Sequence, residues 1–152
     1  MEKLIFGTGL KRYEVNDNGA IFSFNPTDIN LYARFIKMRD AVLKIGAEVE
    51  KKAEEINESE EKSVEAFAST MEDADRRVKQ ELTECFGKSN DFEHIFDGSN
   101  VFSPTLSGNW LITEFITAIT PIIEKEVAAF TKERAKRKAS QIKQNKAKRK
   151  SK

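Results

Sequence analysis

Apolar residues recur at helical spacing through most of the middle of this 152-residue chain. Between residues 29 and 56 they follow a period near 3.6, and the set comprises Ile29, Tyr32, Ile36, Leu43, Val49, Ala53 and Ile56. The pattern resumes at Val64 and continues to Phe86. Such a period places the side chains on one face of a helix, and that face must be covered. The sequence therefore predicts a long amphipathic helix or a helix pair over residues 28–86.

A polar stretch, NESEEKS, interrupts this pattern from residue 57 to residue 63. It favours a break near residues 57–60, because the side chain of Asn57 or Ser59 can cap a second helix. One continuous helix of unusual length is the alternative, since neither proline nor glycine stands in the stretch.

Strand signals dominate the first 25 residues. RYEV and AIFSF are rich in β-branched and aromatic residues, and NDNG between them supplies the Asn and Gly that tight turns favour. We expect a β-hairpin over residues 11–24, with KLIF as a further candidate strand. Because side chains alternate along a strand, Phe22 and Phe24 share one aromatic face that must be covered.

The chain changes character between Lys88 and Gly108. Two glycines, a proline and several Ser and Asn residues are typical of a loop, but the Phe and Ile residues make it unusually apolar. We expect a structured loop over residues 87–108, with a short helix across DFEHIF that Gly98 ends.

Residues 109–131 carry the strongest apolar face of the chain. This face comprises Leu111, Phe115, Ile119, Ile122, Ile123, Val127 and Phe130. We expect this helix to be the most buried element, and Pro121 within it predicts a kink or a split.

Charge is distributed very unevenly along the sequence. Residues 132–152 hold 11 of the 26 Lys/Arg but one of the 25 Asp/Glu, so their net charge is +10 and that of the remainder is −9. This tail has few apolar residues, so we expect it to be disordered, with a fraying helical extension as the alternative. Its basic clusters comprise Lys136, Arg137, Lys138, Lys148, Arg149 and Lys150.

These features predict a mainly helical α+β protein. A single globular domain would span residues 1–131, with the hairpin in residues 1–25, three or four amphipathic helices after it, and a basic tail in residues 132–152. The length and an apolar content of 39% are sufficient for one hydrophobic core.

The sequence also indicates a compartment. Cys85 is the only cysteine, which rules out an internal disulfide and fits a reducing environment such as the cytosol. The N-terminal apolar run is shorter than a signal peptide needs, and no run approaches the roughly 18 apolar residues of a membrane span. We therefore expect a cytoplasmic protein.

The acidic stretch FGKSNDFEHIFDG, residues 86–98, invites comparison with a calcium loop. A loop beginning at Asp91 would need oxygen ligands at its fifth and twelfth positions and glycine at its sixth. This sequence has Ile95, Phe102 and Phe96 there. The stretch therefore does not fit a calcium loop.

Other chemistry finds no better support. A zinc site needs three or four ligands, usually His or Cys, but His94 and Cys85 are the only such residues and no HExxH or CxxC spacing is present. A single cysteine at a helical core position is more often a packing residue than a nucleophile. The GTG of residues 7–9 lacks the rest of a phosphate-binding pattern. We predict no metal, no cofactor and no enzymatic activity.

The apolar pattern favours an interaction protein. The helices, the aromatic hairpin face and the apolar loop offer more apolar surface than a chain of this length would readily bury. Self-association or a partner groove would cover it, and a closed monomer is the alternative. The candidate partner-binding residues are Phe22, Phe24, Phe92, Ile95, Phe96, Trp110 and Phe115.

The order of motifs also resembles a known family. A hairpin, FNPTD, a long acidic helix, ECFGKSNDFEHIFDGSNVFSPTLSGNWLITEFITAITPII and a Lys/Arg-rich end occur in this order. This order is similar to that of the small tail-assembly proteins encoded between the tail-tube and tape-measure genes of long-tailed bacteriophages. The likeness covers about residues 15–130, and the residues that carry it are Phe86, Gly87, Asp91, Ile95, Phe96, Gly98 and the helix start at 110–123.

The resemblance implies a non-enzymatic assembly chaperone or scaffold. Proteins of this family coat the helical tape-measure protein, keep it soluble and hand it to tail-tube subunits in the cytoplasm of the bacterial host. Many of their genes also make a longer form by ribosomal frameshifting. The alternative that the residues support is a small nucleic-acid-associated or regulatory protein that acts through its basic tail.

Overall fold

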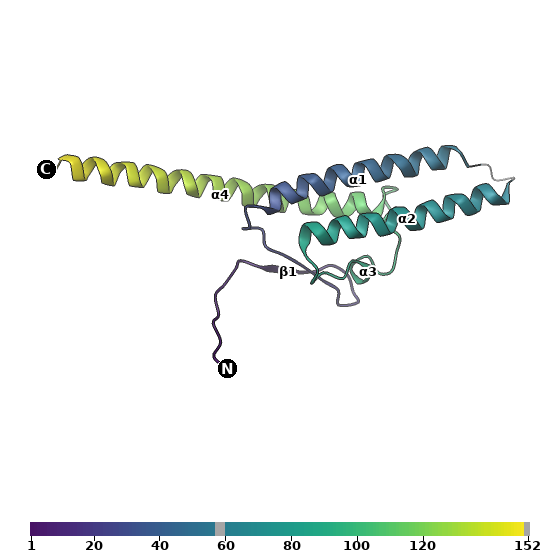
Figure 1. Ribbon diagram of the computed structural model, residues 1–152, viewed down its shortest axis with the longest axis horizontal. Coiled ribbons are helices and arrows are strands. Elements are labelled where there is room, and N and C mark those ends of the chain that lie inside the picture. The colour runs from purple at the N-terminus through teal and green to yellow at the C-terminus, as the bar shows by residue number, and fades with distance from the viewer. Residues whose placement is uncertain (57–59, 151–152) are drawn as a thin grey trace.

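The computed structural model describes residues 1–56 and 60–150, and for Lys150 it describes the backbone alone. A two-stranded antiparallel hairpin precedes the helices, in accord with the predicted, mainly helical α+β class. Figure 1 shows an elongated molecule in which α1, α2 and the first half of α4 lie side by side. The elements are β1 (Lys11–Glu14), β2 (Ile21–Phe24), α1 (Leu31–Glu54), α2 (Glu61–Phe86), α3 (Phe92–Ile95) and α4 (Leu111–Lys150).

The hairpin forms where the sequence predicted it. Lys11 pairs with Phe24, and Gly19 takes a positive φ of 77° in the turn, which glycine adopts without a steric penalty. The further strand expected at KLIF is not formed, and Leu4, Ile5 and Phe6 are 75–89% exposed. These side chains have no packed surface against them that would hold a third strand in place.

Two separate helices replace the single long helix that was the alternative. The helix α1 ends at Glu54 and α2 begins at Glu61, while the predicted caps Asn57 and Ser59 lie outside the described residues. The two helices run side by side in opposite directions (Figure 1). An ion pair joins them at 2.5 Å between Arg77 and Glu48.

The predicted short helix within residues 87–108 is α3. The Asp91 side chain caps it by accepting a hydrogen bond from the His94 amide, and Gly98 follows it with a φ of 72°. Its apolar residues Phe92, Ile95 and Phe96 are at most 6% exposed. This chain itself therefore covers their apolar face.

A cluster of phenylalanines joins the hairpin to the helices. The Phe22 ring lies 5.0 Å from that of Phe86 at the end of α2 and 5.2 Å from that of Phe115 on α4, between ring centroids. Phe115 also lies 5.4 Å from Phe96. Edge-to-face pairs of this kind are stabilising beyond the area they bury. The cluster therefore fixes the first half of α4 against the hairpin.

Asn90 provides a polar link in the same region and is only 5% exposed. Its side-chain oxygen accepts a hydrogen bond from the Ser23 amide at 2.8 Å, and its nitrogen donates to the Ser23 carbonyl at 2.8 Å. The side chain thereby satisfies an edge of β2 that would otherwise be unpaired inside the protein.

The helix α4 differs from the prediction in two respects. It passes through Pro121 without the predicted split, and it continues from the expected end at residue 131 to Lys150. Residues 132–150, expected to be disordered, are thus a helical extension. Low hydrophobicity prevents this segment from packing, but its Ala, Lys, Arg, Gln and Glu residues have high intrinsic helix propensity and no Gly or Pro interrupts them.

Phe96→Asp should lower the free energy of unfolding by at least about 3 kcal/mol, because it removes a buried ring and places a charge in the core. Urea denaturation followed by circular dichroism would measure the loss. Leu106→Asp is a matched control, since Leu106 is fully exposed and should change stability by no more than about 0.5 kcal/mol. Equal midpoints for the two variants would contradict the role assigned to the phenylalanine cluster.

Candidate protein-binding groove

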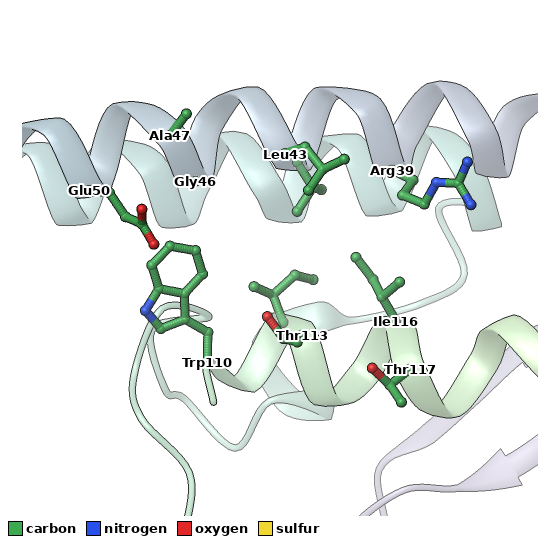
Figure 2. A pocket seen from close by; sticks show the side chains of 11 residues that line it. Arg39, Leu43, Gly46, Ala47, Glu50, Trp110, Thr113, Ile116 and Thr117 are labelled. Atoms are coloured by element: carbon green, nitrogen blue, oxygen red, sulfur yellow. The ribbon is translucent and has the colours of Figure 1, made fainter. Parts of the chain in front are cut away.

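An apolar groove lies between α1 and the first half of α4 (Figure 2). Its volume is about 390 Å³, within the range of sites that hold small ligands or a few side chains of a partner. The residues that line it are Arg39, Val42, Leu43, Gly46, Ala47 and Glu50 from α1, and Trp110, Ile112, Thr113, Ile116 and Thr117 at the start of α4.

Gly46 allows the closest approach between the two sides of the groove. A Cβ added there would lie 3.0 Å from Cζ3 of Trp110, closer than carbon atoms ordinarily pack. The indole ring fits beneath α1 at this glycine and beside Glu50 (Figure 2). It also packs edge-on against Phe102, with 4.9 Å between ring centroids. The tryptophan therefore closes one end of the groove.

Backbone hydrogen bonds hold the start of α4 in place. The Ile112 amide donates to the Val101 carbonyl at 2.9 Å, and the Leu111 amide donates to the Ser103 carbonyl at 3.0 Å. These two amides belong to the first turn of α4, where a helix cannot satisfy its own N–H groups. The preceding loop thus fixes the direction in which α4 leaves Trp110.

The loop is itself fixed to α2. The Val101 amide donates to Asp75 at 2.8 Å, and Lys79 joins Asp75, Glu93 and the Ser99 carbonyl at 2.8, 2.8 and 3.1 Å. Lys79 is only 8% exposed, so its charge depends on these partners. The groove wall therefore rests on a rigid support.

Glu114 completes the start of α4. Its carboxylate accepts hydrogen bonds from the side chains of Ser107, Asn109 and Thr105. The hydrogen bond from Ser107, followed by that from Asn109, holds the pKa of this carboxyl below its usual value. A negative charge in the first turn of a helix is also favoured by the helix dipole.

The structure divides the seven predicted partner-binding residues. Five are in the core and at most 6% exposed, namely Phe22, Phe24, Phe92, Ile95 and Phe96. They cannot contact a partner while the protein stays folded, so we assign them to packing. Phe115 faces the phenylalanine cluster, and Trp110 alone of the seven lines the groove.

Sequence reasoning missed the other groove residues. Leu43 and Ile116 were recognised as members of apolar helix faces, but not as neighbours across a groove. Leu43 is 66% exposed, whereas a residue of the same helix face such as Val42 is buried. The extra width of the apolar stripe on α1 was the only signal in the sequence.

The basic residues of the tail are all displayed on the α4 extension. Lys136, Lys138, Lys148 and Arg149 are exposed, and Arg137 makes an ion pair with Glu133 at 3.7 Å. Lys150 ends the helix. No apolar neighbour covers this segment within the described part of the chain.

The acidic loop has structural partners. Asp97 accepts a hydrogen bond from Asn18 in the hairpin turn at 2.5 Å, Glu93 pairs with Lys79, and Asp91 caps α3. His94 is exposed. Over residues 1–56 and 60–150, no group of three His, Cys, Asp or Glu side chains is placed to hold a metal ion, and no helix is long and apolar enough to span a bilayer.

Comparison of the chain with protein-family models, with curated protein sequences and with solved structures yields no match.

The Cys85 thiol should be unreactive in the folded protein. It is 3% exposed, and burial raises its pKa from 9.0 to about 12. Because the thiolate is the reactive form, this shift alone should slow labelling by a disulfide reagent near pH 8 by about 1,000-fold relative to the urea-unfolded chain. Rapid stoichiometric labelling of the folded protein would instead identify a reactive cysteine.

Proposed function

We propose that this protein is a non-enzymatic tail-assembly chaperone or scaffold of a long-tailed bacteriophage, working in the cytoplasm of the bacterial host. Its groove between α1 and α4 would hold an apolar helix of the tape-measure protein, and the complex would then meet the tail-tube protein. The single observation that carries the proposal is the groove itself, an exposed apolar surface with supported walls. The order of sequence motifs supports the choice of family.

The groove fits a helix better than a compact small molecule. It runs along α1 from Arg39 to Glu50, a distance of about 16 Å at the helical rise per residue. An amphipathic partner helix would place apolar side chains three and four residues apart along such a surface. Leu43, which is 66% exposed, would lie against them.

The two ends of the groove add polarity to this recognition. Arg39 lines one end and Glu50 the other, and neither makes an ion pair among the described residues. A partner helix with an acidic residue near Arg39 and a basic residue near Glu50 would satisfy both charges. Such complementarity selects one direction of the bound helix and contributes more to specificity than to affinity.

Leu43→Asp should weaken binding of a helical tape-measure segment by at least 10-fold. The substitution removes a leucine contact worth about 1.5–3 kcal/mol when fully buried, and 1.4 kcal/mol corresponds to a factor of 10. Titration followed by the fluorescence of Trp110, the only tryptophan, would measure affinity in the groove directly. Leu106→Asp, outside the groove, should bind as the unmodified protein does.

Equal affinity of the Leu43→Asp and unmodified proteins would overturn the groove as the binding site. A gene neighbourhood without tail-tube and tape-measure genes would overturn the assignment to tail assembly. These two results are independent, because a helix-binding groove does not require a phage origin.

The second candidate is a nucleic-acid-associated or regulatory protein that acts through the α4 extension. The observation that favours it is the exposure of its Lys and Arg residues on one continuous helix. Phosphate contacts by such residues release counterions, so binding would weaken steeply as salt rises.

Deletion of residues 132–152 separates the two candidates. Loss of DNA retention without loss of tape-measure binding would assign the extension to nucleic acid and leave the groove with its proposed partner. If the full chain shows no DNA retention even at about 0.05 M salt, where phosphate contacts are strong, the second candidate is excluded.

A further inference from the structure

The α4 extension, defined here as residues 132–150, is a helix without a partner. It is exposed along its whole described length and projects beyond the rest of the molecule (Figure 1). At the helical rise per residue it is about 28 Å long. An isolated helix of this length is marginal in water, and most helices in proteins depend on a packed face. The extension therefore has a surface that another chain would stabilise.

One face of the extension carries small apolar side chains. Ala135, Ala139 and Ile142 stand at helical spacing on it, and Ile142 is 48% exposed. Basic residues surround this strip. Of the Lys and Arg residues from Lys132 to Lys146, only Arg137 makes an ion pair within the described structure, and its partner Glu133 lies on the same helix.

The opposite end of the molecule carries the opposite charge. The segment from Glu48 to Glu72, here called the hairpin end, comprises the last turns of α1 and the first turns of α2. Its sequence holds nine acids and three bases, a net charge of −6. Glu54, Glu61 and Glu65 make no ion pair among the described residues.

The hairpin end also lacks a third helix. The helix α4 begins at Leu111, close to Gly46, and runs away from the hairpin end (Figure 1). Only α1 and α2 form this part of the molecule, and apolar side chains stay partly uncovered there. Val64 is 43% exposed, and Phe67 on the same face is half-buried.

We infer that the α4 extension of one copy docks on the hairpin end of a second copy. The two surfaces lie at opposite ends of one chain, so they cannot meet within a monomer (Figure 1). Two copies arranged antiparallel would form both contacts at once, as a two-fold symmetric dimer requires. Charges of +10 for residues 132–152 and −6 for the hairpin end would steer the encounter, and the alanine strip would cover Val64 and Phe67.

A second copy fits the extension better than nucleic acid does. Sequence-tolerant binding of single strands uses aromatic side chains on which bases stack, and residues 132–152 contain none. The extension instead combines positive charge with an apolar strip, and the hairpin end combines negative charge with apolar side chains. The inference goes beyond the proposed function, since the groove between α1 and α4 takes no part in this contact.

Reversal of charge on each surface tests the inference with the full-length chain. One variant carries Glu54→Lys, Glu61→Lys and Glu65→Lys, and the other carries Lys136→Glu, Lys143→Glu and Lys146→Glu. By sedimentation at about 0.1 M salt, we expect the unmodified chain to dimerise and each variant to dimerise at least 10-fold more weakly. At about 1 M salt the screening length falls from about 10 Å to about 3 Å, and the unmodified dimer should weaken too.

Mixing the two variants supplies the decisive measurement. Each extension in the mixture meets a hairpin end of opposite charge, so the mixed dimer should form where neither variant alone does. A matched control with Glu14→Lys, Glu84→Lys and Glu124→Lys has the same net charge as the first variant but leaves both surfaces intact, and should dimerise normally. The Leu43→Asp variant should also dimerise normally, which separates this inference from the proposed function.

Three results would overturn the inference. They are a monomer at all accessible concentrations in about 0.1 M salt, where charge steering still acts, a dimer that both reversed variants form as well as the unmodified chain, and a mixture that does not associate. A monomer whose extension binds a DNA duplex would assign the extension to nucleic acid instead.

Discussion

The contact of Phe22 with three other phenylalanines determines where most of the remaining structure lies. Its ring centroid is 5.0 Å from that of Phe86, 6.0 Å from that of Phe92 and 5.2 Å from that of Phe115. A two-stranded hairpin is at best marginally stable in water, whereas one that buries its aromatic face gains about 1.5–3 kcal/mol for each fully buried ring. The hairpin, α2, α3 and α4 thus share one source of stability.

The groove depends on this cluster through the position of α4. Phe115 is fixed by the cluster, and one turn further on the same helix Ile119 is buried as well. At the other end, the loop from residue 99 to residue 110 fixes the start of α4 to α2 through Asp75. A surface held at both ends loses little conformational entropy when a ligand binds, which favours affinity.

Local sequence signals predicted the elements of the fold better than their arrangement. The Asn-Gly turn at residue 19, the helical periodicity of α1 and α2, and the glycine after α3 were sufficient to place those elements, because each depends on neighbours in the chain. Periodicity shows that Phe96 must be buried, but not whether its own chain or a partner buries it. The seven candidate residues were therefore mostly assigned to the wrong surface.

Two further features were beyond sequence reasoning for physical reasons. The contact of Gly46 with Trp110 joins residues 64 positions apart, and nothing in the surroundings of either residue indicates the other. The helical state of the extension was missed because low hydrophobicity was taken to imply disorder. Hydrophobicity governs packing, whereas local helix formation also depends on intrinsic propensity, which is high for Ala, Lys and Arg.

The long separation between the hairpin and the residues that cover it has a consequence for synthesis. The Asn16 side chain donates to the His94 carbonyl at 2.9 Å, and Phe22 packs on Phe115, so the first folded element is completed by some of the last residues made. At about 5–20 residues per second, the ribosome needs on the order of 5–20 s to add them. During that interval Phe22 and Phe24 have no cover from the residues that will bury them. The contacts within α1 and α2 are local and need no such delay, so the paired helices would be present before the hairpin docks.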